Sequence, residues 1–183
     1  TLTLLDLTEK GKAKNSITNA ELILSYDPLL KGAIRFNELT QRQDIVKDLG
    51  WERNTFGKAF TDNDLYNIHL YCERTYGISS MKLIEEAIHI TANRDSYHPI
   101  RDFLNSLKWD GTERIPHVLY HFLGAAEDEY TCEAMKIFLL GAIKRVFQPG
   151  CKFETMLCLV GGQGAGKSTF FRLLAIKDEW FSD

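Results

Sequence analysis

The sequence lacks the features of membrane, secreted and zinc-binding proteins. No stretch approaches the roughly 20 apolar residues that a membrane-spanning helix needs, and residues 1–10 lack the basic start and apolar centre of a signal peptide. None of the four cysteines belongs to a C-x-x-C pair, so we expect no disulfide and no zinc site. With 44% hydrophobic and 26% charged residues, the chain is expected to be a globular protein of the cytoplasm that contacts no membrane.

An excess of basic charge is also missing. The net charge is −3 at pH 7, so any contact with nucleic acid must come from a local basic patch or from loops that line a channel in an assembly. Lys10, Lys12 and Lys14 stand close together and have the chemistry to touch phosphate, but we favour a solvated loop there. Charge alone therefore neither proves nor excludes DNA binding.

The most informative motif lies near the C-terminus. Residues 161–168 read GGQGAGKS and match the phosphate-binding pattern G-x-x-x-x-G-K-[ST]. The apolar run before it, residues 156–160, predicts a buried parallel strand, and residues 169–175 predict a helix whose N-terminus faces the loop. The alternative is a glycine-rich turn with a surface lysine, which a full match between a strand and a helix disfavours.

The residue types of this motif suit a nucleoside triphosphate, ATP, with Mg²⁺. Glycines at 161, 162, 164 and 166 allow positive φ and let backbone N–H groups approach phosphate oxygens. Lys167 is expected to act as the catalytic lysine on the β- and γ-phosphates, and the Ser168 hydroxyl to ligate Mg²⁺. The predicted nucleotide-binding residues are Gly161, Gly162, Gln163, Gly164, Ala165, Gly166, Lys167 and Ser168.

Residues 1–61 predict a small α/β region. Residues 18–21, TNAE, form a capping-box pattern, which predicts a helix that begins at Thr18 and ends before Pro28. Residues 33–37 alternate apolar and polar side chains, as a half-buried strand does. Nearby aromatic bulk comes from Trp51, Phe56 and Phe60.

Residues 62–96 predict two helices joined by a short turn. Apolar side chains recur at helical spacing from Leu65 to Tyr76, Gly77 closes the first helix, and Ser80 caps the second. A DNA-reading helix-turn-helix is compatible with this pattern, although two glutamates on its second helix argue against tight contact with DNA. We prefer a plain helical hairpin. The residues facing a DNA groove would be Lys82, Glu85, Glu86 and His89.

Residues 97–150 predict a helical region. One helix begins at Pro99, a second ends at Gly124, and a third covers residues 130–147. His117 and His121 lie four residues apart, as some metal ligands do, but no third ligand suggests itself and we predict structural roles for both.

The patterns predict an α/β protein with largely helical N-terminal and middle regions. Residues 151–183 would then supply the strand, loop and helix that begin a P-loop NTPase core. The chain ends 16 residues after Lys167, before such a core could supply a second acidic strand or an arginine that stabilises transferred charge. We therefore expect the chain to be cut short and not to complete hydrolysis by itself.

Five short segments occur in a fixed order along the second half of the chain. They are residues 97–99 (YHP), 107–114 (LKWDGTER), 149–153 (PGCKF), 160–170 (VGGQGAGKSTF) and 179–183 (EWFSD). Together they resemble the virulence-associated protein E family, P-loop ATPases of prophages, plasmids and genomic islands that are similar to superfamily III helicases. The resemblance is strong from about Tyr97 to Asp183 and weaker before Arg94.

This resemblance implies an ATP-driven DNA replication protein in a bacterial cytoplasm. Its subunits would form a homo-oligomeric ring around single-stranded or forked DNA, with helices 99–147 as a small domain before the ATPase core. The resemblance carries residues 161–168 over as the nucleotide loop and adds Thr169 as a further phosphate contact. The family's acidic Walker B motif, its sensor residue and its arginine finger have no counterpart in this sequence.

Two other functions are considered beside an ATP-driven helicase. The first is a recruitment module whose N-terminal helices bind DNA or a partner, with the nucleotide as an assembly switch. The second is a small-molecule phosphotransferase, which ranks last because we find neither a substrate pocket nor a lid in the sequence.

Overall fold

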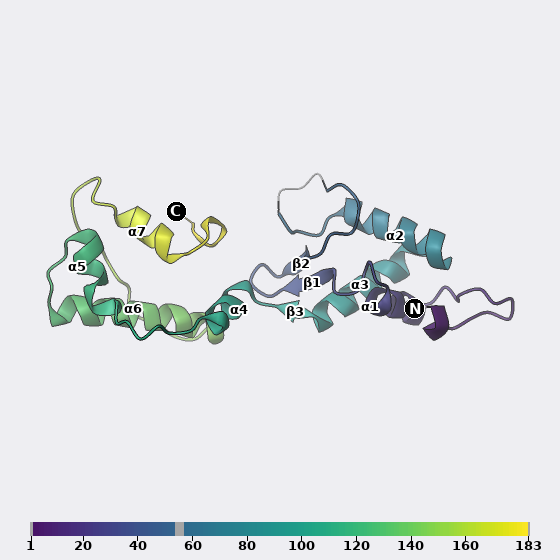
Figure 1. The fold of residues 1–183 in the computed structure, drawn as a ribbon, viewed down its shortest axis with the longest axis horizontal. Helices are drawn as coiled ribbons and strands as arrows, with labels where there is room; N and C mark the ends of the chain where they lie inside the picture. Colours follow the sequence, from purple (N-terminus) through teal and green to yellow (C-terminus); the bar gives the residue numbers. More distant parts are fainter. Residues whose placement is uncertain (1, 54–56, 183) are drawn as a thin grey trace. The chain divides into compact units, whose positions relative to one another are not determined.

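The chain folds as two units, each with its own hydrophobic core. The computed structural model describes residues 2–53 and 57–182, so that Phe56, expected to add aromatic bulk, lies outside the described residues. The first unit is Thr1–Asn105 and the second is Ser106–Asp183 (Figure 1). The structure is thus mixed α/β, as predicted, with its sheet confined to the first unit among the residues described.

The N-terminal unit packs helices on one small sheet. The sheet order is β2-β1-β3, in which β1 pairs antiparallel with β2 and parallel with β3 (Figure 1). Helix α3 contacts both α1 and β1 and so joins the helices to the sheet. The elements are η1 (Leu2–Leu4), α1 (Ile17–Tyr26), β1 (Ile34–Asn37), β2 (Arg42–Ile45), α2 (Asp62–Tyr76), α3 (Met81–Arg94), β3 (Ser96–Tyr97) and α4 (Pro99–Ser106).

The start of α1 differs from the prediction. Ser16, not Thr18, is the N-cap, since its backbone is extended and its side chain accepts a hydrogen bond from the Asn19 N–H. Thr18 lies inside the first turn, and Glu21 accepts hydrogen bonds from Ser25 and Arg94 instead of closing a capping box. The prediction failed because two hydroxyl residues stand two positions apart, and the sequence alone does not show which of them is the N-cap.

The helix pair α2 and α3 follows the prediction closely. Thr61 and Asp64 form a capping box at the start of α2, and Gly77 ends the helix in the left-handed conformation with φ +76°. The Ser80 side chain caps α3. The buried faces of α1, α2 and α3 meet in the core of this unit, where the largest fully buried apolar side chains are Ile23, Leu30, Ile68, Ile78, Ile84 and Ile88.

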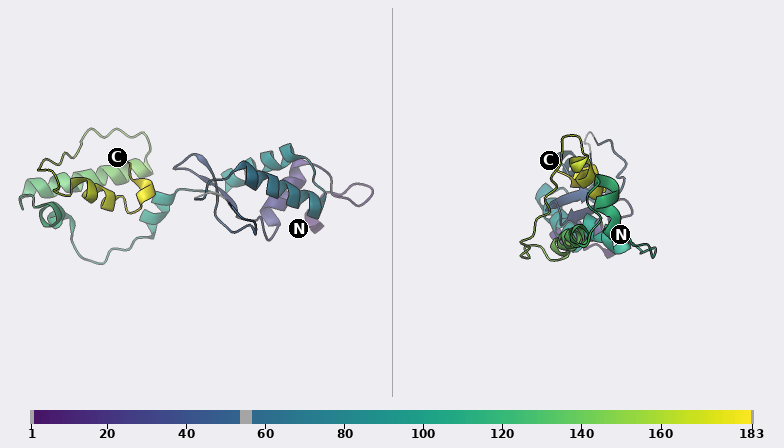
Figure 2. Two further views of the ribbon diagram at one scale, coloured as in Figure 1. Left: turned by 90° about the horizontal axis from the view of Figure 1, so that it is seen from above. Right: turned by 90° about the vertical axis from the view of Figure 1, so that its left-hand side faces the viewer.

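The C-terminal unit is helical. Its predicted helices form, α5 ends at Gly124 with φ +66°, and Asp128 caps α6. Helix α7, in yellow, overlaps α6, in green, in the left view of Figure 2, and the rings of Phe138 on α6 and Phe171 on α7 are in edge contact at 5.8 Å. No helix in the described part of the chain is long and apolar enough to cross a membrane. The elements are η2 (Ile115–His117), α5 (Val118–Leu123), α6 (Glu129–Phe147), α7 (Lys167–Leu174) and η3 (Asp178–Trp180).

The strand predicted for residues 156–160 is wrong: the segment has no regular secondary structure. Its side chains do alternate, because Leu157 and Leu159 pack on the core while Val160 is 98% exposed. A strand also needs a neighbour to complete its backbone hydrogen bonds, and the described residues of this unit contain no other strand. Helix α7 likewise begins at Lys167, two residues before the predicted start.

One aromatic contact holds the chain segment between α6 and the glycine-rich loop against α6. Gly141 is buried in the middle of α6, and a Cβ atom there would lie 2.2 Å from Cζ of the Phe153 ring. Arg145 strengthens the contact, since its Nη2 donates to the Phe153 carbonyl at 3.1 Å and its guanidinium lies 5.8 Å from the ring centre. The path toward residues 161–168 is therefore attached to α6 by Phe153.

Candidate nucleotide-binding site

The glycine-rich loop connects residues 151–160 to α7. Gly164 and Gly166 have φ of +80° and +78°, a region that favours glycine, whereas Gly161 and Gly162 do not, contrary to the prediction. Gly166 is the N-cap of α7 and provides no side chain to cap it. The first N–H groups of α7 therefore face the loop without a side-chain partner at the cap, which is the arrangement that binds anions at helix N-termini.

Lys167 reaches back across this loop. Its Nζ donates to the carbonyl oxygens of Gly161 at 2.8 Å and Gly162 at 2.7 Å. An ammonium has three donors, so one remains for a further acceptor. The positive charge is thus held at the loop by neutral carbonyls, and a phosphate oxygen would be a stronger acceptor than either of them.

The remaining predicted residues are placed by the packing of α7. Phe170 is buried and its ring lies 5.7 Å from that of Phe171, so one side of α7 faces the core. Ser168 and Thr169 are exposed. The structure therefore brings Lys167, Ser168 and the left-handed glycines to the same end of α7, with both hydroxyls accessible.

A cavity of about 550 Å³ lies beside the loop. Its walls come from α5, α6 and residues 155–160, and the loop contributes Gly161, Ala165 and Lys167. The sequence reasoning missed this cavity, because residues of α5 and α6 looked like ordinary core positions. Gly141, an isolated glycine within an apolar helix, was the available signal that another segment packs closely against α6.

These residues fit a triphosphate with Mg²⁺. The uncapped N-terminus of α7 and the Lys167 ammonium match the negative charge of phosphates, and ideal Cβ atoms at Gly161 and Gly164 would meet no atom within 4 Å, so the space beside the loop is open. The exposed Ser168 hydroxyl supplies an oxygen ligand of the kind that Mg²⁺ prefers. Among the described residues, no group of three or more His, Cys, Asp or Glu side chains could hold a metal without a nucleotide.

The histidine pair on α5 and η2 serves other contacts. His117 Nδ1 lies 3.2 Å from Glu127 Oε1, and the His121 ring meets Phe122 edge-on at 4.8 Å. Both contacts join side chains of the C-terminal unit, and the structural roles expected for this pair stay a prediction.

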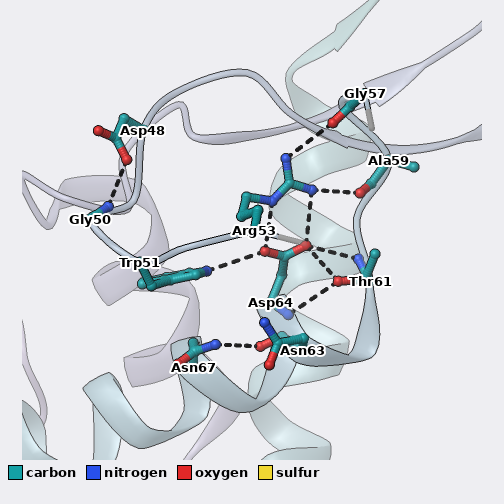
Figure 3. A network of polar contacts seen from close by, with 10 residues as sticks. All are labelled: Asp48, Gly50, Trp51, Arg53, Gly57, Ala59, Thr61, Asn63, Asp64 and Asn67. Atoms are coloured by element: carbon teal, nitrogen blue, oxygen red, sulfur yellow. Dashed lines mark hydrogen bonds and ion pairs between the residues drawn. The ribbon is translucent and has the colours of Figure 1, made fainter. Parts of the chain in front are cut away.

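The main polar network of the N-terminal unit is structural (Figure 3). The buried carboxylate of Asp64 receives Nε and Nη2 of Arg53 at 2.9 and 3.0 Å, the Trp51 indole at 3.2 Å, and both the N–H and hydroxyl of Thr61. Burial alone would raise the pKa of Asp64, but these hydrogen bonds outweigh it and hold the pKa below its ordinary value. With its acceptor positions filled, Asp64 holds the residues before α2 in place.

A second carboxylate cluster involves Tyr97 of the YHP segment. The Tyr97 hydroxyl donates to Asp44 at 2.6 Å, and Asn37 donates to the same oxygen at 2.7 Å. Burial and the bond to Asp44 raise the pKa of Tyr97. Because the three residues belong to β1, β2 and β3, the cluster ties the strands of the sheet together.

The exposed face of α3 carries mixed charge. Lys82 lies 3.9 Å from Glu86, Glu85 is also exposed, and His89 Nδ1 lies 2.9 Å from the Gln43 amide. A helix that reads DNA would present a basic face to the phosphates. The helices α2 and α3 therefore have the predicted spacing, but the described exposed face of α3 carries no basic patch.

The family comparison singles out the second unit. Residues 104–183 match a virulence-associated protein E-like domain. This match supports the resemblance, although it leaves out the YHP segment at 97–99. The matched residues include α5, α6, the glycine-rich loop and α7. No curated protein matches the chain.

Proposed function

We propose that the chain binds Mg·ATP at residues 161–169 and is the nucleotide-binding part of a mobile-element DNA replication protein. The observation that carries the proposal is the placement of Lys167 at the start of α7, with its ammonium 2.7 and 2.8 Å from two loop carbonyls. A phosphate-binding loop needs a lysine at this place, directly after a left-handed glycine, and Gly166 provides that glycine. The match to the virulence-associated protein E-like domain covers the same residues.

The binding step follows from the donors at the loop. Phosphate oxygens would replace the carbonyls of Gly161 and Gly162 as partners of Lys167, because an ammonium attracts an anionic oxygen more strongly than a neutral carbonyl oxygen. The N–H groups at the start of α7 would bind the same anion. Ser168 and the phosphates would hold Mg²⁺, which neutralises the charge that develops when the γ-phosphate leaves.

Unwinding of DNA by a ring of such subunits is the wider part of the proposal. It rests on the family resemblance, since the net charge of −3 gives no overall basic field and the described face of α3 carries mixed charge. Glu133 is the acidic residue in the cavity wall, and it lies 3.0 Å from Lys136. No other carboxylate of the described residues lines the cavity, so we expect slow hydrolysis by this chain alone.

The first test is Mg·ATP binding to the full chain, measured by calorimetry. Lys167→Ala is expected to weaken binding about tenfold or more, because it removes a charged donor to phosphate. Lys152→Ala is the matched control, as Lys152 is an exposed lysine of the same unit that pairs with Glu154 at 2.7 Å. Equal affinity of the Lys167→Ala variant and the native chain would refute nucleotide binding at the loop.

The replication part has a separate test. Steady-state turnover of Mg·ATP is measured with and without single-stranded DNA, with Lys167→Ala as the background. Stimulation by DNA that depends on the lysine supports a replication ATPase. A turnover that DNA leaves unchanged argues against the helicase and leaves nucleotide binding standing.

A recruitment module is the second candidate, favoured by the separate N-terminal core and its α2–α3 pair. The four-residue turn from Gly77 to Ser80 has the length found between the helices of DNA-binding helix-turn-helix proteins. If this function holds, the full chain binds DNA without nucleotide in a gel-shift assay at low salt. A negative result there removes the DNA version of this candidate.

A further inference from the structure

The lysines of the N-terminal unit that the nucleotide site does not use lie on a hairpin before α1. Residues 6–14 fold back on themselves through a bridge between Leu7 and Ala13. The Lys14 N–H donates to the Asp6 carbonyl at 2.8 Å and closes the base of the hairpin. Figure 1 shows this hairpin, in purple, extending away from α1. The lysines expected in a solvated loop therefore stand on a hydrogen-bonded projection of the fold.

A buried side chain of α1 holds the base of the hairpin. Asn19 is fully buried; its Oδ1 accepts from the Asp6 N–H at 2.8 Å, and its Nδ2 donates to the carbonyls of Asp6 and Lys14 at 2.9 and 2.8 Å. Because one amide binds both strands, the direction of the hairpin relative to α1 is fixed. Just after the hairpin, Asn15 donates to the Ser79 hydroxyl at 3.4 Å, in the turn between α2 and α3. The hairpin therefore stands beside the start of α3.

The ammonium groups of the hairpin have no partner among the residues that the structure describes. Lys10, Lys12 and Lys14 are exposed, and their side chains take part in no ion pair or hydrogen bond there. Lys12 and Lys14 stand two positions apart on one strand, so their side chains lie on the same face. With Asp6 and Glu9, the hairpin carries a net charge of +1. Contact with a polyanion should therefore be favourable but weak, and sensitive to salt.

We propose that this hairpin binds the phosphate backbone of double-stranded DNA through its three lysines. The inference rests on the recruitment candidate of the proposed function, in which α2 and α3 act as a helix-turn-helix. In such proteins the N-terminal residues of the second helix meet the base edges, and the hairpin stands at that end of α3. The mixed charge on α3 gives little attraction to phosphate, and the hairpin supplies what α3 lacks. Since phosphate contacts carry no base recognition, the lysines should raise the affinity for all duplexes alike.

The experiment measures binding of the full chain, without nucleotide, to a fluorescent DNA duplex of about 20 base pairs, by anisotropy from about 50 to 200 mM salt. The triple variant Lys10→Ala, Lys12→Ala, Lys14→Ala is expected to weaken binding about tenfold or more at the lowest salt. It should also reduce the slope of log K against log salt concentration by about 2–3, because each lost phosphate contact removes roughly 0.9 from that slope.

Two further variants separate the hairpin from the overall charge. The triple variant Lys31→Ala, Lys58→Ala, Lys108→Ala removes the same charge from exposed lysines outside the hairpin, and should keep the salt slope and change the affinity by less than about twofold. Glu9→Gln removes a carboxylate from the hairpin and should strengthen binding about threefold, because like charges repel. All of these side chains are exposed, so the variants are expected to fold, which circular dichroism checks.

The outcomes separate this inference from the proposed function. DNA binding that the hairpin variant weakens no more than the control variant would overturn the hairpin site and leave the recruitment module standing. Failure of the native chain to bind the duplex at about 50 mM salt would refute both the hairpin site and the DNA version of that module, whereas Mg·ATP binding at the loop has its own test. Polyglutamate is added as a competitor: if it displaces the duplex as well as unlabelled DNA of equal charge does, the hairpin binds acidic chains in general and the assignment to DNA fails.

Discussion

Among single residues, Asp64 has a structural effect that can be tested. Its side chain is 1% exposed, and that of Arg53 is 19% exposed. Burial would raise the pKa of this carboxyl, yet hydrogen bonds from Arg53, Thr61 and Trp51 together lower it. A carboxylate whose pKa is lower in the folded state stabilises the fold at pH values above its unfolded pKa of about 3.9, and that stabilisation is lost as the pH falls through the folded pKa.

Asp64→Asn should therefore lower the free energy of unfolding at pH 7 by about 3 kcal/mol, because it leaves the Arg53 guanidinium partly buried without its carboxylate. Urea unfolding of the N-terminal unit, followed by circular dichroism from pH 7 to pH 2, measures the effect. The loss of stability in acid should also become shallower below about pH 4. This loss of stability in acid should not vanish. Burial would raise the pKa of Asp27, but hydrogen bonds from Tyr76 and Tyr71 outweigh it, so the pKa of Asp27 is lowered as well.

Asp62→Asn provides the comparison at the same end of α2. Asp62 is exposed, and its charge interacts with the helix dipole, so its loss should cost about 0.3–1 kcal/mol. If both variants lose the same stability, or if the acid dependence of Asp64→Asn matches that of the native chain, the Arg53 contact does not stabilise the fold.

Among the elements, α6 and the segment after it are coupled through one glycine. Gly141→Ala places a Cβ atom 2.2 Å from the Phe153 ring, which must move. Overpacking typically costs about 1–3 kcal/mol, and alanine regains up to about 1 kcal/mol of helix propensity over glycine, so we expect a net loss of about 1–2 kcal/mol. Thermal unfolding of the C-terminal unit measures it.

A double-mutant cycle shows whether Phe153 is the cause. In a Phe153→Ala background the clash is gone, so Gly141→Ala should become neutral or stabilising. A cost that stays the same in both backgrounds would place its origin in α6 itself and contradict the contact.

Elements also differ in how well the sequence predicts them. The helices α2 to α6 depend on local signals, namely caps such as Ser80, stops such as Gly77 and Gly124, and apolar spacing along one chain segment. A strand depends on a partner elsewhere, and residues 156–160, which had the composition of a buried strand, have none among the described residues.

The candidate site likewise has one part that a local sequence pattern predicts and another part that depends on contacts between segments far apart in the sequence. Lys167, Ser168 and the loop glycines form a local pattern and could be predicted as a group. The cavity beside them is built from α5, α6 and residues 155–160, which are separated along the sequence. Only packing such as Phe153 on Gly141 brings these segments together, and no local pattern specifies that packing.

At the scale of the whole molecule, the two units have cores of unequal size. The N-terminal core extends over α1, α2, α3 and the sheet, whereas the buried residues of the C-terminal cluster, among those described, are Leu119, Met135 and Phe170. Because burial of apolar surface stabilises a fold by roughly 25 cal/mol per Å², the C-terminal unit should be the less stable of the two. Its amides should exchange with solvent at lower urea than those of α1 and α3.

Mg·ATP should act on only one of these units. A ligand that binds the native state at 100 times its Kd stabilises that state by about 2.7 kcal/mol, so α6 and α7 should gain protection in hydrogen exchange while α3 does not. Lys167→Ala should abolish the gain, because it removes the charged donor to phosphate at the loop. Equal protection of α3 and α7 would mean that the two units unfold together. Bound nucleotide would then stabilise the N-terminal helices against unfolding as well.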